Sequence, residues 1–156
     1  MTTNIQTNKP VVRFGSEGAA VKELQTLINA FLNTARLKVD GIFGTQTENA
    51  VKEMQERFFL TVDGIVGAKT WKALTARKND SLPTLQSGSQ GDLVRRVQTR
   101  LAIHNYAVGA IDGIFGPKTT AAVKKFQTDR SLKADGIIAS QTWVQLSYLY
   151  PYQSGR

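Results

Sequence analysis

Apolar residues recur at spacings of three and four in six segments of the chain. This spacing places them on one face of an α-helix, where they can be buried together. The segments form three pairs, which are 21–31 with 94–101, 47–58 with 119–126, and 71–74 with 143–146. Asn33 and Asn105 follow the first pair, and asparagine tolerates the left-handed conformation that ends many helices. The pattern therefore predicts an all-α fold with three helices in each half of the chain.

A short phrase occurs four times along the chain. It reads VDGIFGTQT from Val39, VDGIVGAKT from Val62, IDGIFGPKT from Ile111 and ADGIIASQT from Ala134. Copies in the two halves are 72 residues apart and copies within one half are 23 apart, which predicts two tandem three-helix-bundle modules, each with an internal pseudo-repeat. The expected boundaries are an N-terminal arm at 1–9, module 1 at 10–75, a linker at 76–82, module 2 at 83–147 and a C-terminal tail at 148–156.

Each copy of the phrase combines a tight turn with the start of a helix. Glycine after aspartate accepts a positive φ, and the aspartate carboxylate can accept bonds from backbone N–H groups just downstream. The second glycine stands where a helix N-cap is expected. We expect structural roles in these corners for Asp40, Gly41, Gly44, Asp63, Gly64, Asp112, Gly113, Gly116, Asp135 and Gly136. In the last copy Ala139 replaces the cap glycine, which is expected to weaken the start of the last helix by about 1 kcal/mol unless Ser140 caps it instead.

A glutamine stands beside an apolar position in the first two helices of each module. Both halves of its amide can bond to backbone groups of a loop, so we predict a structural role for Gln25, Gln55, Gln98 and Gln127. A module of about 65 residues is near the lower limit for a self-sufficient core and cannot spare its bulkiest side chains. We therefore expect the core to include Phe43, Trp71, Phe115 and Trp143.

Taken together, these segments resemble a known family. In module 1 they read GSEGAAVKELQTLI, DGIFGTQTENAVKEMQ and LTVDGIVGAKTWKAL, and in module 2 GSQGDLVRRVQTRL, DGIFGPKTTAAVKKFQ and LKADGIIASQTWVQL. They resemble the bacterial peptidoglycan-binding domain family of small three-helix modules. The resemblance implies a noncatalytic, wall-anchoring module of the kind usually fused to amidases, muramidases or peptidases. It implies peptidoglycan as the partner, and a separate cell-wall hydrolase as a further candidate partner.

The resemblance also implies a place in the cell wall or periplasm. The start MTTNIQTNKP lacks the apolar segment of a secretory signal, so a cytoplasmic location stays open as an alternative. No apolar run approaches the roughly 18 to 20 residues that span a bilayer, so we expect no transmembrane segment. We expect the chain to be a monomer.

The charge of the chain is positive and uneven. The net charge is +8, and the segment 83–146 carries 8 basic against 4 acidic residues, whereas 10–75 carries 8 against 7. Such a balance favours polyanionic partners in general. A nucleic-acid interpretation would rest on Arg95, Arg96, Arg100, Lys124 and Lys125. No nucleic-acid motif accompanies these residues, so we expect no specific nucleic-acid partner.

Residues that could carry catalysis are scarce. Cysteine is absent and His104 is the one histidine, which argues against a zinc hydrolase. A Ser-His-Asp triad would need that same histidine, and the sequence has no G-x-S-x-G elbow to present a nucleophile. We expect a packing or surface role for His104. The paired corner aspartates stand in equivalent turns, whereas a catalytic acid and base need unlike environments. We therefore expect no catalytic residue, no metal and no cofactor.

Candidate ligand contacts lie on the loops around the first Asp-Gly corner of each module. A wall fragment offers acetamido groups, hydroxyls and carboxylates, so a binding groove needs amide donors, a cation and a flat apolar patch. The candidates are Arg36, Lys38, Ile42, Thr45, Asn105, Tyr106, Ile114 and Lys118. The alternative is that they are solvated loop residues.

The leading hypothesis is a noncatalytic peptidoglycan-binding protein whose two modules gain avidity from the short linker. The alternative is a cytoplasmic or particle-associated protein-interaction adaptor built on the same modules. The tail holds Tyr148, Tyr150 and Tyr152 around Pro151, an aromatic segment suited to docking. Such a tail can equally fold back on its own domain.

Overall fold

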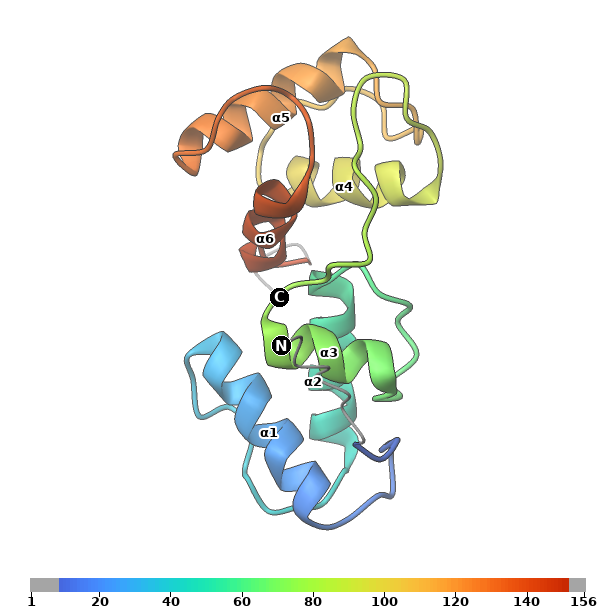
Figure 1. Ribbon diagram of the computed structural model, residues 1–156, viewed down its shortest axis with the longest axis vertical. Helices are drawn as coiled ribbons and strands as arrows, with labels where there is room; N and C mark the ends of the chain where they lie inside the picture. Colours follow the sequence, from blue (N-terminus) through green and yellow to red (C-terminus); the bar gives the residue numbers. More distant parts are fainter. Residues whose placement is uncertain (1–8, 152–156) are drawn as a thin grey trace, which may run out of the picture. The chain divides into compact units, whose positions relative to one another are not determined.

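Six helices make up the fold of this computed structural model, which describes residues 9–151. They are α1 (Ala19–Leu32), α2 (Thr45–Arg57), α3 (Ala68–Ala76), α4 (Asp92–Ile103), α5 (Pro117–Asp129) and α6 (Ser140–Tyr148). The chain divides into two compact units between Lys78 and Asn79, inside the expected linker (Figure 1). Each unit holds three helices, so the predicted all-α fold of two three-helix modules is confirmed. The third helices, α3 and α6, end at Ala76 and Tyr148, one residue beyond the expected module ends.

The first helix of each module ends close to an asparagine. Asn33 caps α1 in the left-handed conformation, with φ 51°, as predicted. In module 2 the cap of α4 is His104, and Asn105 adopts φ 69° one residue later. In both modules a residue that tolerates positive φ turns the chain toward the first Asp-Gly corner.

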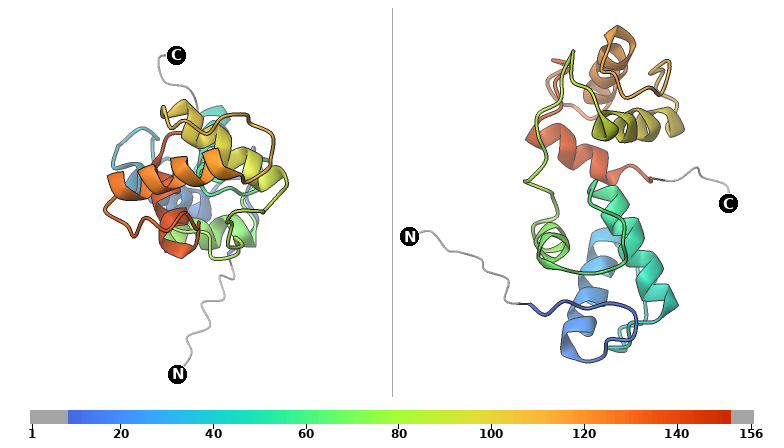
Figure 2. Two further views of the ribbon diagram at one scale, coloured as in Figure 1. Left: turned by 90° about the horizontal axis from the view of Figure 1, so that it is seen from above. Right: turned by 90° about the vertical axis from the view of Figure 1, so that its right-hand side faces the viewer.

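Each module buries the apolar faces of its helices in a core of its own. In module 1, Val21, Leu24 and Ile28 of α1 are fully buried, and α1 packs on both α2 and α3. In module 2, α4 packs on α5 (Figure 2). The four aromatic residues expected in the cores are all buried, which confirms that prediction for Phe43, Trp71, Phe115 and Trp143.

The tryptophans also tie the start of each module to its last helix. The indole N–H of Trp71 donates to the carbonyl of Pro10 at 2.9 Å, and that of Trp143 donates to the carbonyl of Pro83 at 2.9 Å. A buried indole needs such an acceptor, because its N–H would otherwise lose its bond to water. Each bond spans about 60 residues, so it forms only when the module closes.

Four isolated antiparallel bridges hold the loops between the helices. In module 1 they join Val12 to Val66 and Glu17 to Ile42, and in module 2 they join Leu85 to Ile138 and Gln90 to Ile114. Each bridge fastens an Asp-Gly corner to the segment that leads into the first helix. The corners are thereby fixed at both of their sides.

Both ends of the described chain contact the adjacent module. Lys9, expected in the N-terminal arm, forms an ion pair with Glu23 and lies 5.3 Å from the ring centre of Trp71. In the tail, Leu149 and Pro151 are buried, and the imidazole Nε2 of His104 lies 2.8 Å from the carbonyl oxygen of Tyr150. The backbone of the tail thus contacts His104 of module 2. Tyr152 lies outside the described residues.

The cap at Ala139 has the same backbone shape as the glycine caps. Its φ of −120° compares with −104° at both Gly44 and Gly116. These are extended conformations that any residue adopts, so glycine is not required there by its φ. No side chain caps α6, and Ser140 therefore does not replace the missing glycine.

Candidate functional site

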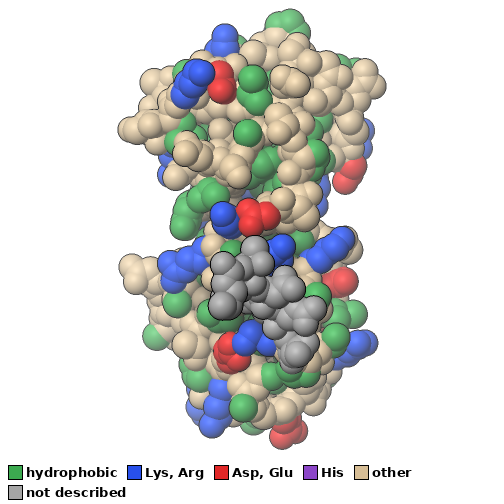
Figure 3. Space-filling view, in the orientation of Figure 1, with side chains coloured by type: hydrophobic (Ala, Val, Ile, Leu, Met, Phe, Trp, Pro, Cys, Tyr) green, Lys and Arg blue, Asp and Glu red, His purple; other side chains and the backbone are tan. Residues whose placement is uncertain are grey.

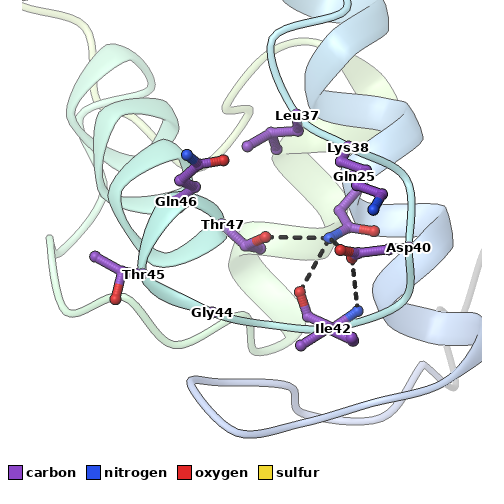
Figure 4. Close-up of a pocket in the computed structure, with 9 residues that line it drawn as sticks. All are labelled: Gln25, Leu37, Lys38, Asp40, Ile42, Gly44, Thr45, Gln46 and Thr47. Atoms are coloured by element: carbon purple, nitrogen blue, oxygen red, sulfur yellow. Dashed lines mark hydrogen bonds between the residues drawn. The ribbon is translucent and has the colours of Figure 1, made fainter.

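The first corner of module 1 is organised by the side-chain amide of Gln25. Its Oε1 accepts the backbone N–H of Gly41 at 3.0 Å. Its Nε2 donates to Asp40 Oδ1, to the carbonyl of Ile42 and to Thr47 Oγ1, each at 3.1 Å (Figure 4). A single buried amide thereby joins α1, the turn and the start of α2.

The same arrangement is present at the other three corners. Their amides belong to Gln55, Gln98 and Gln127, which are at most 1% exposed. The amide oxygens accept backbone N–H bonds of 2.9 Å from Gly64, Gly113 and Gly136. Buried polar groups need such partners, and these bonds give the glutamines the structural role predicted for them. Their amides are therefore already used within the scaffold.

The corner aspartates anchor the turns. Asp40, Asp112 and Asp135 each accept, at 2.9 to 3.0 Å, the N–H of the isoleucine two residues downstream. This backbone bond is the main cause that holds the pKa of all three carboxyls below the ordinary value of 3.8. Glycine must follow, because Gly41 has φ 75° and a Cβ there would lie 3.1 Å from the carbonyl oxygen of Gly18.

An open hollow of about 210 Å³ lies beside the first corner of module 1. It brings together three of the predicted contacts, Lys38, Ile42 and Thr45. Leu37 on the loop and Gln46 on α2 lie across its mouth (Figure 4). Ile42 is 55% exposed, which leaves an apolar side chain at the rim.

A second hollow of about 350 Å³ adjoins the first, and the two share Leu37 and Gln46. It contains the predicted contact Arg36, together with Asn49, Ala50 and Glu53 of α2. We call the two adjoining hollows the α2 groove. The α2 residues of this groove were not among the predicted contacts, although the spacing 46, 49, 53 marks one polar helix face.

A buried ion-pair cluster forms one wall of the α2 groove. Glu53 Oε1 accepts from Arg36 Nη1 at 2.9 Å, and Glu53 Oε2 accepts from Arg57 Nε at 3.0 Å. The side chain of Glu53 is 7% exposed, whereas that of Arg36 is 43% exposed. Arg36 is therefore held on its inner side and open to solvent on its outer side.

The corresponding hollow of module 2 has a different lining. It measures about 470 Å³ and includes the predicted contacts Ile114 and Lys118. The other two predicted contacts, Asn105 and Tyr106, are not among its lining residues. The hydroxyl of Tyr106 instead donates to Asp129 Oδ2 at 2.8 Å, and burial, followed by this bond, raises the pKa of the phenol.

The second corner of each module has a hollow as well, at about 360 Å³ in module 1 and 250 Å³ in module 2. The sequence offered a signal for them in the 23-residue pseudo-repeat, yet no contact was predicted there. Each of the four hollows is lined by a single lysine, taken from the loop or from the helix start, and these are Lys38, Lys69, Lys118 and Lys133. Every corner thus presents one cation beside its turn.

Within residues 9–151, no group of three or more histidine, aspartate or glutamate side chains could hold a metal ion. The basic run on α4 is shorter than its sequence indicates, because Arg100 is buried and its Nη1 donates to the carbonyl of Leu146 at 3.0 Å. Lysine and arginine side chains lie as separate spots on the face drawn in Figure 3.

No helix in the described part of the chain has the length and apolar character needed to cross a membrane.

Two corners with their glutamines and caps make up one module, and a family model matches this module twice. The model is described as "Putative peptidoglycan binding domain", and it matches residues 17–74 and 90–146. The chain belongs to this family. Association with the bacterial cell wall follows from the domain, and the resemblance seen in the sequence is confirmed.

Similar proteins include enzymes that act on the cell wall according to their names. The N-acetylmuramoyl-L-alanine amidase CwlL of Bacillus licheniformis is 38% identical over 89% of this chain and 46% of its own length. The N-acetylmuramoyl-L-alanine amidase CwlM of Mycobacterium tuberculosis is 34% identical over 92% of this chain and 39% of its own length. The chain thus spans less than half the length of these two relatives.

A solved structure, the SleB N-terminal domain, is 33% identical to this chain. The match covers 42% of this chain and 90% of the chain of that structure, with a TM-score of 0.41.

Proposed function

We propose that this chain is a noncatalytic peptidoglycan-binding unit whose two modules bind neighbouring positions of the wall. The observation that carries the proposal is that the first corner of each module has an open hollow beside it. Each hollow has an exposed isoleucine, Ile42 at 55% or Ile114 at 50%, and one lysine. An apolar patch beside a cation suits the acetamido, hydroxyl and carboxylate groups of a wall fragment.

Two weak sites joined by a short linker bind a repeating polymer more tightly than one site does. We propose that this avidity gives the chain its affinity, and that its place is the cell wall or periplasm. The relatives named as amidases support a further proposal, in which a wall hydrolase, linked or separate, supplies the chemistry near the bound modules.

The adaptor hypothesis has less support from the described residues. In the tail that was to serve as a docking segment, Leu149 and Pro151 are buried. Tyr148 and Tyr150 keep 44% and 39% of their surface exposed. Their contacts are partly taken up within the chain, so the wall-binding proposal is preferred.

The test is co-sedimentation of the full chain with insoluble peptidoglycan sacculi at low and physiological salt. We expect saturable pelleting that survives competition by duplex DNA. Ile42→Ser and Ile114→Ser should each weaken pelleting, and the double variant should abolish it.

Val39→Ser and Ile111→Ser are matched controls, because both side chains are 45% exposed and neither lines a hollow. Equal pelleting by all of these variants, or release by DNA, would contradict the proposal.

A further inference from the structure

Arg36 differs from the corner lysines because a buried carboxylate fixes its position. Glu53 uses one oxygen for Arg36 and the other for Arg57, at 2.9 and 3.0 Å. The side chains of Glu53 and Arg57 are 7% and 10% exposed, so this part of the cluster is out of water. Glu53 thus bonds to two guanidinium groups at once, and the guanidinium of Arg36 is the one that lines the α2 groove.

The bond to Glu53 leaves most of the Arg36 guanidinium available. An arginine carries five N–H donors, and among the described residues Glu53 is the partner of its Nη1. The Nε and Nη2 donors form the planar fork that matches the two oxygens of a carboxylate. Because Glu53 already restrains the side chain, less conformational entropy is lost when a ligand binds.

The neighbouring residues of the groove suit a peptide attached to that carboxylate. Gln46 and Asn49 project from the same face of α2 as Glu53, and their side-chain amides have no bond within residues 9–151. Leu37 and Ala50, both nearly fully buried, line the same hollow. The groove thus combines a fixed fork donor, two free amides and a small apolar floor.

We propose that Arg36 binds a free peptide carboxylate in the α2 groove, while Gln46 and Asn49 bond to the adjoining peptide groups. This inference rests on the proposed function, since the stem peptides of peptidoglycan carry free carboxylates. It specifies the ligand as a short peptide acid rather than the glycan. Asp40 is the acidic side chain of the adjoining hollow. Its negative charge repels the carboxylate of the bound peptide, which therefore stays at the Arg36 side of the groove.

Module 2 lacks this arrangement. The residues found 72 positions after Gln46, Asn49 and Glu53 are Lys118, Ala121 and Lys125, and the loop 105–111 before the first corner of module 2 contains no arginine. Neither a fork donor nor a buried acidic partner for one is present at these positions. Recognition of a peptide carboxylate is therefore a property of module 1, and the two modules contact different parts of the polymer.

The test is an NMR titration of the full chain with the peptide N-acetyl-Lys-D-Ala-D-Ala and with the same peptide carrying a C-terminal amide. We expect the acid to shift the side-chain amide signals of Gln46 and Asn49. The C-terminal amide should bind roughly tenfold or more weakly, because a charge-assisted bond is lost.

Arg36→Lys is the informative variant, because it keeps the charge and removes the fork. We expect it to weaken binding of the acid roughly tenfold and to leave binding of the amide unchanged. Lys124→Gln is the control, since this exposed lysine lies outside both hollows. Glu53→Gln provides a second variant, in which Arg36 keeps its charge and loses its restraint, and thermal melting verifies that each variant is folded.

The outcomes separate this inference from the proposed function. Equal affinity for acid and amide, or an Arg36→Lys variant that binds the acid like the unmodified chain, would overturn the role of Arg36. Sacculi would then still pellet the protein if the wall-binding proposal holds. Failure of the unmodified chain to pellet with sacculi would instead overturn the proposed function.

Discussion

Helices α2 and α5 occupy equivalent places in the two modules but carry an ion pair of opposite polarity. In module 1 the pair is Glu53 with Arg57, whose side chains are 7% and 10% exposed. In module 2, 72 residues later, it is Lys125 with Asp129, whose side chains are 68% and 43% exposed and whose atoms are 3.4 Å apart. The same helix position therefore holds a buried cluster in one module and a surface pair in the other.

The glutamine networks of the two modules do not differ in this way. Gln25 and Gln98 make the same set of bonds to a glycine N–H, an isoleucine carbonyl, an aspartate and a threonine. The residues that hydrogen-bond to the buried backbone of the turns are therefore the same in both modules, whereas the charged residues on the outer helix face differ. Specific binding is thus to be sought on that outer face.

The largest loss of stability is expected when the glutamine network common to both modules is removed. Gln25→Leu and Gln98→Leu should each destabilise their own module by about 3 kcal/mol, because buried turn groups lose their partners. Each module has one tryptophan with a bonded indole N–H, so two indole NMR signals followed in urea report the modules separately. Unequal losses at the two sites would show that the networks are not equivalent.

A smaller loss of stability is expected at the ion pairs, which are buried in module 1 and exposed in module 2. Glu53→Gln should destabilise module 1 by about 2 kcal/mol, since the buried Arg57 loses the carboxylate that it bonds to at 3.0 Å. Lys125→Gln at the equivalent position should change module 2 by at most about 0.5 kcal/mol, because exposed pairs contribute little. The same indole signals measure both. Similar effects in the two modules would contradict the assignment of one cluster as buried and the other as exposed.

A smaller effect is expected at the start of the last helix. Ala139→Gly should stabilise module 2 by about 0.5 kcal/mol, because glycine is the better N-cap and the extended backbone there accepts it. Gly67→Ala is the reciprocal change in module 1, where the cap of α3 has φ −98°. It should lower stability by a similar amount in urea unfolding, and an unchanged midpoint in both variants would refute the role of the cap.

The smallest effect concerns acid stability. The bond donated by Tyr106 is the main cause that lowers the pKa of Asp129 below 3.8. Module 1 has Arg57, and no carboxyl group, at the equivalent position. Because the folded-state pKa is depressed, this contribution is present above about pH 3.8 and is lost as pH falls through the folded value.

Tyr106→Phe should therefore raise the pKa of Asp129 in a carboxyl NMR titration. It should also lower the stability of module 2 above pH 3.8, with the difference shrinking in more acidic solution. No difference between the variant and the unmodified chain at any pH would mean that Tyr106 acts only through its ring, which packs on Phe126 with ring centres 5.6 Å apart and which phenylalanine retains.

The two modules, their six helices and the corners between them were predictable from the sequence alone. These features depend on local rules: helical spacing of apolar residues, the positive φ that glycine accepts, and the asparagine at the end of α1. The repeated glutamine was also interpretable, because an amide beside a core position needs buried partners. The predicted contacts Lys38, Ile42 and Thr45 proved to share one hollow.

Which charged side chains are buried could be seen only in the tertiary structure. Arg57, Glu53 and Arg100 have the sequence setting of solvated helix residues, yet the packing of distant segments covers them. Arg36 meets Glu53 across 17 residues, and the tail meets His104 across 46. Such contacts are set by how helices and loops pack in three dimensions, and that packing joins the two hollows into the α2 groove of module 1.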